Sequence, residues 1–161
     1  MPKPKRINNQ EKKNKRPSWK EYFLSVAKIA SSRSTCDRLR VGAVIVKNKA
    51  ILSTGYNGSS RGLPHCDDVG HEISDGHCIR TIHAEANALV HAARHGIAID
   101  GATMFLTNSP CYDCFKMIVN AGIKEVVYSG FYMSRYGASK KVLDLAKKAG
   151  VKIKHLEIKE V

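Results

Sequence analysis

The sequence lacks the features of membrane and secreted proteins. No stretch of its 161 residues is long and apolar enough to cross a bilayer. The basic start, residues 1–16, has no apolar segment behind it and so does not resemble a secretory signal. No internal repeat is present, and an apolar fraction of 43% suits one globular domain with a sizeable core.

Acidic residues are scarce, with 14 Asp and Glu against 27 Lys and Arg, for a net charge of +13. Nearly half of the excess lies in residues 1–17, which also hold three prolines and few apolar residues. This composition predicts a disordered basic tail before a folded domain at 18–161. Such a tail can bind nucleic acid through phosphates or act as a solvated arm. It has no aromatic residue before Trp19, whereas single-strand binding surfaces interleave aromatic and basic side chains, so nucleic acid is not the expected partner.

Cysteines are few and odd in number, five in all, which favours a reducing compartment and predicts a cytoplasmic protein. Two of them form the run Pro110-Cys111-Tyr112-Asp113-Cys114. A lone C-x-x-C is shared by redox and structural-metal sites and decides little by itself.

That run follows an upstream His83-Ala84-Glu85 segment. One histidine and two cysteines suit zinc and leave its fourth tetrahedral position for water. Glu85 need not be a ligand and can act as an acid and base beside that water. The order H-x-E then P-C-x-x-C is the signature of zinc nucleobase deaminases. We therefore predict a catalytic zinc held by His83, Cys111 and Cys114, with Glu85 as the catalytic residue.

A second group of soft ligands lies in the loops. The remaining cysteines are Cys36, Cys66 and Cys78, and the last two lie in a long segment, 57–80, without an apolar pattern. Loops of this length are usually functional or held by something. Together with His71 these cysteines would complete a closed structural zinc site, with His65 and His77 as substitutes for His71. The alternative is three free thiols and surface histidines.

The remaining pattern predicts alternating helices and strands. Ser18 and Glu21 have capping-box spacing before a helix. Strands 41–46 and 51–56 form a hairpin across Asn48-Lys49, and strands follow at 103–107, 124–129 and 151–158. Helices are expected at 83–95, 111–121 and 138–149. The core-facing residues are predicted to be Tyr22, Phe23, Val26, Ile29 and Ala30 in the first helix and Ala86, Leu89, Val90 and Ala93 in the second. The fold class is α/β, three-layer α/β/α, with a mixed central sheet of about five strands.

These motifs resemble the deoxycytidylate deaminases of bacteria and phages, in the cytidine deaminase-like superfamily. The resemblance spans 18–161 and rests on the zinc motifs, Ser34-Thr35-Cys36, 41–46, Gly55-Tyr56-Asn57-Gly58 and 76–85. It implies zinc-dependent hydrolysis of dCMP to dUMP and ammonia, which supplies dUMP for thymidylate synthesis. It also implies that Asn57 contacts the sugar and that Tyr132 lies against the nucleotide. Backbone N–H groups near Ala84 are expected to hold the pyrimidine. Homohexamers, activation by dCTP and inhibition by dTTP follow from the same resemblance.

The sequence leaves three alternatives open. They are a deaminase of RNA or single-stranded DNA, a deaminase of free nucleosides or pterins, and a non-enzymatic zinc module or DNA-uptake accessory. Glu85 argues against the last, because a structural site has no use for an acid beside an open coordination position. The phosphate-binding cation is also open among Arg38, Arg40, Arg80, Lys116 and Arg135.

Overall fold

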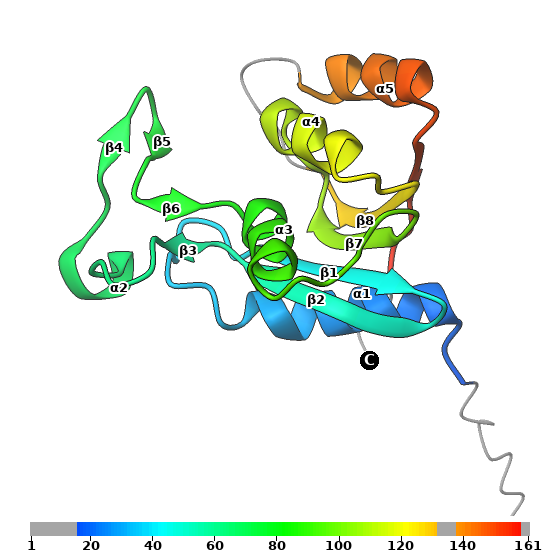
Figure 1. The fold of residues 1–161 in the computed structure, drawn as a ribbon. Helices are drawn as coiled ribbons and strands as arrows, with labels where there is room; N and C mark the ends of the chain where they lie inside the picture. Colours follow the sequence, from blue (N-terminus) through cyan, green and yellow to red (C-terminus); the bar gives the residue numbers. More distant parts are fainter. Residues whose placement is uncertain (1–15, 132–137, 159–161) are drawn as a thin grey trace, which may run out of the picture.

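In the computed structural model, which describes residues 16–131 and 138–158, helices and strands alternate after an opening hairpin (Figure 1). The helices are α1 (Trp19–Ser31), α2 (Cys66–Val69), α3 (Ala84–Arg94), α4 (Tyr112–Asn120) and α5 (Ala138–Ala149). The strands are β1 (Gly42–Lys47), β2 (Ala50–Tyr56), β3 (Gly58–Ser59), β4 (Ile73–Ser74), β5 (His77–Cys78), β6 (Thr81–Ile82), β7 (Thr103–Asn108), β8 (Glu125–Gly130) and β9 (Lys152–His155). The predicted last strand, 151–158, is therefore shorter than expected.

A five-stranded sheet in the order β2-β1-β7-β8-β9 forms the middle layer. β1 pairs antiparallel with β2 and β7, whereas β7, β8 and β9 run parallel. Helix α1 packs on one face through a core that includes Phe23, Val44 and Phe105. Helices α3, α4 and α5 cover the other face (Figure 1). The predicted three-layer fold with a mixed sheet is confirmed.

Two local signals produce the elements that the sequence predicts. The Ser18 side chain accepts a hydrogen bond from the Glu21 backbone, and the Glu21 side chain accepts one from the Ser18 backbone, completing a capping box at α1. Asn48 and Lys49 both adopt positive φ angles, 52° and 64°, in the two-residue turn between β1 and β2. Such turns match the twist of the strands that they join.

The predicted core face of α1 is wrong in part. The buried residues are Phe23, Leu24, Ala27 and Ser31, whereas Ile29 is 70% exposed. The reason lies in the sheet: a Cβ on Gly42 would overlap the Ala27 carbonyl and stand 2.7 Å from the Ser31 nitrogen. Small residues at 27 and 31 let the helix backbone approach this glycine, so their face turns inward.

The same effect corrects the predicted face of α3. Ala84, Glu85, Ala88 and Ala92 are buried, in place of the predicted Ala86, Leu89, Val90 and Ala93. Leu89 is half-buried against the core, and Val90 is 61% exposed. The alanines recur every four residues and form a flat strip that packs closely on β2. Side-chain size decided which face is buried, more than hydrophobicity did.

The segment between β2 and α3 forms an arm that extends away from the main sheet (Figure 1). Its short strands pair as β3 with β6 and β4 with β5, and α2 is a single turn. The sequence predicted a largely irregular segment here, and the structure adds these short elements. No helix among the described residues is long and apolar enough to span a membrane. Residues 1–15 of the predicted tail lie outside the described residues, as do Tyr132 and Arg135.

Candidate active site

The histidine and cysteines of the two motifs converge at the starts of two helices. His83 is the N-cap of α3 and Cys111 is the N-cap of α4, with Cys114 in the first turn of α4. His83 Nδ1 lies 3.5 Å from Cys111 Sγ and 3.4 Å from Cys114 Sγ. All three ligand atoms lie within 4.8 Å of one another. Two thiols and one imidazole nitrogen at this spacing fit a tetrahedral zinc ion with one open position.

The pKa values of the two thiols are shifted in opposite directions. The Cys111 pKa is lowered to about 4, first by the side-chain hydrogen bond from Cys114 and further by His83. The pKa of Cys114 is raised by the same hydrogen bond and by burial. The Cys114 backbone N–H also points to Cys111 Sγ, at 3.5 Å. Helix N-termini favour thiolates in this way, and thiolate is the form that binds metal.

Glu85 lies in the first turn of α3 and is only 4% exposed. Burial disfavours the charged carboxylate and raises the pKa of Glu85 to about 7. A carboxyl group with a pKa near neutrality can both accept and return a proton, which is the property required of an acid–base catalyst.

A cavity of about 390 Å³ opens beside these residues. His83, Ala84, Glu85 and Cys111 line it, as do Cys36 and Cys78. Other residues of the cavity wall were not predicted from the sequence, namely Leu39, Val41, Asp75, Gly76, Thr81, Asn108 and Ser109. For two of them a signal was available: Asn108 and Ser109 are polar residues at the carboxyl end of β7, directly before the Pro110-Cys111 pair.

Asn57 lines the cavity and is 7% exposed. Its Oδ1 accepts a hydrogen bond from the Val41 backbone N–H at 2.8 Å, and its Nδ2 donates one to the Leu39 carbonyl at 2.8 Å. Asn57 therefore shapes the loop that enters β1. This positioning role is additional to the sugar contact that the resemblance predicts.

Of the candidate cations for a phosphate, Arg38 lies in the cavity wall. Its Nη2 donates a hydrogen bond to the Gly76 carbonyl at 3.0 Å. Two other candidates already pair with carboxylates: Arg80 Nη2 lies 3.7 Å from Glu72 Oε2, and Lys116 Nζ lies 2.8 Å from Asp113 Oδ1. Arg40 is exposed and outside the cavity wall.

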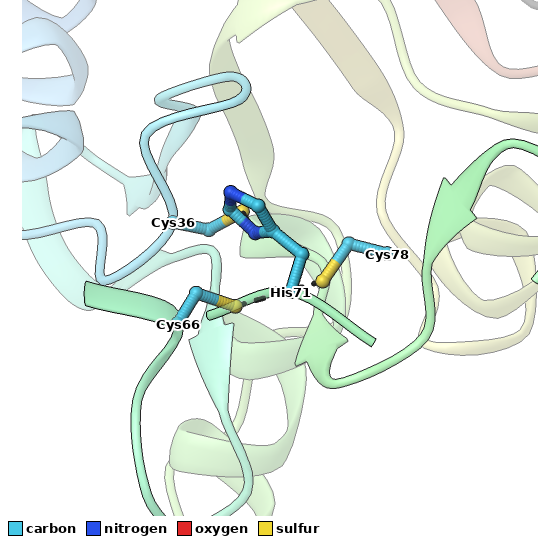
Figure 2. A group of neighbouring side chains, drawn as sticks. All are labelled: Cys36, Cys66, His71 and Cys78. Atoms are coloured by element: carbon cyan, nitrogen blue, oxygen red, sulfur yellow. Dashed lines mark hydrogen bonds between the residues drawn. The ribbon is translucent and has the colours of Figure 1, made fainter. Parts of the chain in front are cut away.

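The second group of ligands also converges (Figure 2). Cys36 from the loop after α1 lies near Cys66 of α2, His71 and Cys78 of β5, and their ligand atoms all lie within 4.8 Å of one another. Cys36 Sγ is 3.6 Å from His71 Nδ1, and the sulfurs of Cys66 and Cys78 are 3.5 Å apart. Among the described residues, the substitutes His65 and His77 are not part of this group. Three thiols and one imidazole fit a closed structural zinc site.

The surroundings of this group suit a metal. His71 turns its other ring nitrogen, Nε2, to the Asp37 carboxylate at 3.0 Å. Metal-binding histidines usually have such an outer partner, which orients the ring. Burial raises the pKa of Cys66 to about 12. Burial also acts to raise the pKa of Cys78. Hydrogen bonds with the backbone of Arg80 and Glu72 and with the side chains of Cys66 and His71 together outweigh burial and lower that pKa to about 6.

Several known proteins are similar to this chain in sequence. The family model for the cytidine and deoxycytidylate deaminase zinc-binding region matches residues 17–130. The chain is 42% identical over 146 residues to ComE operon protein 2 of Bacillus subtilis, which covers 91% of this chain and 75% of that protein. It is 40% identical over 125 residues to deoxycytidylate deaminase of Mycobacterium phage D29, over 70% of this chain and 95% of the phage protein.

A solved structure is similar over most of this chain. The dCMP deaminase from the cyanophage S-TIM5, in complex with dCMP and dUMP, has 37% sequence identity and a TM-score of 0.74. The match covers 88% of this chain and 99% of the cyanophage chain.

Proposed function

Because this chain belongs to the cytidine and deoxycytidylate deaminase family, we propose that it hydrolyses dCMP to dUMP and ammonia. The observation that carries this proposal is the placement of buried Glu85 near the convergent His83, Cys111 and Cys114, in a cavity whose wall includes Glu85, His83 and Cys111. Relatives named as deoxycytidylate deaminases support the choice of substrate.

Zinc is the metal of this family. We assign its binding to His83 Nδ1 and the sulfurs of Cys111 and Cys114, the atoms that converge in the structure. When bound, the zinc supplies a water whose pKa is lowered to about 7. Three protein ligands leave one position open, and this distinguishes a catalytic zinc site from a closed structural one.

Glu85 moves the protons. Overall, water replaces the C4 amino group of cytosine, so one proton must reach N3 and the departing nitrogen must leave as ammonia. Glu85 accepts one proton from the water and delivers it to N3 as the water oxygen bonds to C4. Glu85 then takes the remaining proton of that oxygen and passes it to the amino group, so that ammonia leaves and the oxygen becomes the C4 carbonyl. The low exposure of Glu85 keeps bulk solvent away from its carboxyl group, which limits competing proton exchange.

The cavity supplies the substrate contacts. We assign the pyrimidine to the backbone beside Ala84, the sugar to the neighbourhood of Asn57 and the phosphate to Arg38. The hydrogen bond from Arg38 to Gly76 uses one of its five guanidinium donors, which leaves others for phosphate oxygens. The resemblance predicts that Tyr132 lies against the nucleotide, and this contact stays a prediction.

We assign a second, structural zinc to Cys36, Cys66, His71 and Cys78. Because Cys36 and Cys78 also line the cavity, this metal would hold part of the substrate-binding wall as well as the arm. The arm contains little apolar core of its own, so metal binding would provide much of its folding free energy.

We also propose a cytoplasmic homo-oligomer. All five cysteines are unpaired, which suits a reducing compartment. Large apolar side chains including Ile29, Ile79 and Val90 are more than half exposed in the single chain, and subunit contacts would cover such residues. The resemblance predicts a hexamer with dCTP as activator and dTTP as inhibitor. Light scattering and assays with each triphosphate test these points.

The central experiment measures ammonia release from dCMP, CMP, deoxycytidine and short oligonucleotides. We expect dCMP to give the highest kcat/KM. An equal kcat/KM for deoxycytidine would show that the enzyme does not recognise the phosphate. Preferential turnover of oligonucleotides would favour a nucleic-acid deaminase instead.

A further inference from the structure

Helix α3 carries at its carboxyl end two histidines that the proposed deamination does not use. His91 and His95 are four residues apart and both are exposed. Their ring centroids lie 4.3 Å apart with an angle of 35° between the ring planes. Four-residue spacing places both rings on one face of the helix, the arrangement by which helical H-x-x-x-H pairs bind a single metal ion.

The hydrogen bond of the second ring determines which of its nitrogens is available. His95 Nδ1 lies 2.8 Å from the carbonyl oxygen of His91. A carbonyl oxygen only accepts hydrogen bonds, so Nδ1 carries the hydrogen. In the neutral ring the lone pair is therefore on Nε2.

The His91 ring has the same tautomer as His95, and its partner is Ser53 on β2. The Ser53 hydroxyl donates to the Ala88 carbonyl at 2.8 Å, so its single hydrogen is already used. His91 Nδ1 lies 3.3 Å from Ser53 Oγ and must be the donor in that contact. Because Ser53 is only 3% exposed, this partner is held in place by the packing of α3 on the sheet. The neutral His91 ring also has its lone pair on Nε2.

We propose that His91 and His95 form a surface binding site for a divalent first-row transition metal such as Ni²⁺, Cu²⁺ or Zn²⁺, with both Nε2 atoms as ligands and water completing the coordination. Imidazole nitrogen is a preferred ligand for these ions. A metal-binding histidine usually donates its opposite ring N–H to a carboxylate, a backbone carbonyl or water. His95 has a backbone carbonyl in this place, and His91 has the Ser53 hydroxyl.

The position on the helix adds to the attraction. The carboxyl end of a helix carries partial negative charge, which favours a cation there. Arg94 lies between the two histidines in the sequence and opposes this effect. With only two protein ligands, the site would bind an exchangeable ion, unlike the two clusters that we assign to resident zinc.

The test is a calorimetric titration of the zinc-loaded protein with NiCl₂, with released zinc measured in parallel. We expect one Ni²⁺ to bind per chain without zinc release. His91→Gln and His95→Gln should each weaken that affinity by about tenfold or more, because one imidazole cannot chelate. Arg94→Gln is the matched control on the same turn and should bind Ni²⁺ as tightly as the wild type or more tightly.

Thermal unfolding supplies a second measurement, since an ion that binds only the folded chain raises the Tm of the protein. Ni²⁺ should raise the Tm of the wild type and of Arg94→Gln, but not of the chain with both histidines replaced. Equal Ni²⁺ affinity in the wild type and the histidine variants would overturn the proposal. So would Ni²⁺ uptake that is matched by zinc release, or the absence of binding at millimolar Ni²⁺. None of these outcomes depends on deaminase activity.

Discussion

Gly55 of β2 lies directly against the first turns of α3, where Ala84 begins the helix. A Cβ on residue 55 would overlap the Ala84 carbonyl oxygen and stand 2.5 Å from the Ala88 nitrogen. The absent side chain therefore sets how closely the helix approaches the sheet. Because His83 and Glu85 flank Ala84, this contact also sets the position of the proposed catalytic groups.

Gly55→Ala should destabilise the protein by about 1–3 kcal/mol, because backbone atoms cannot move aside as flexible side chains do. Chemical denaturation measures the free energy of unfolding. Thr54→Ala, at an exposed position on the same strand, is the control and should change it by about 0.5 kcal/mol at most. An unchanged stability in Gly55→Ala would mean that α3 can shift outward freely.

Glu85→Gln should keep its zinc and lower kcat for dCMP by about 10²–10⁴-fold, since the amide cannot accept a proton from water. Metal analysis and steady-state kinetics on the same sample separate the two effects. Glu157→Gln, at an exposed position near the carboxyl end, should match the wild type in both. Near-normal turnover by Glu85→Gln would remove the proton-transfer role.

The purified protein should contain two zinc ions per chain. Cys66→Ser should lower this to one and destabilise the fold by about 4 kcal/mol or more, as losses of structural metal do. Cys111→Ser should also retain one zinc but lose turnover, with a smaller loss of stability. One zinc per native chain, with Cys36, Cys66 and Cys78 readily alkylated, would disprove the structural site.

Arg38→Gln should raise the KM for dCMP by about 10- to 100-fold and leave turnover of deoxycytidine unchanged, because a charged hydrogen bond to phosphate is lost. Arg40→Gln removes the same charge two residues away, outside the cavity wall. Equal effects of the two substitutions would point to general electrostatic attraction and not to a specific phosphate contact.

Removal of residues 1–16 should leave dCMP turnover unchanged, since that basic stretch contains no residue of the proposed site. Kinetics of the shortened and full-length chains provide the measurement. A large fall in turnover would show that the tail reaches the cavity or a subunit contact.

The sequence by itself determined the features that depend on near neighbours. Ser18 and Glu21 cap α1, Asn48 and Lys49 form the hairpin turn, and Cys111 caps α4. Each of these residues lies within a few positions of the groups that it contacts. The ligand chemistry also pointed to the two groups of thiols and imidazoles that converge in the structure, because both sets of side chains suit zinc.

Only the tertiary structure decided which helix faces are buried and which residues share the cavity. Hydrophobic periodicity pointed to Ile29 and Val90. Close contact with Gly42 and Gly55 instead turned inward the face of α1 that carries Ala27 and the alanine face of α3. Likewise, no local pattern shows that Cys36 and Cys78 border the same cavity as Glu85. Both outcomes depend on how closely backbones far apart in the sequence can approach, and that distance is set by packing.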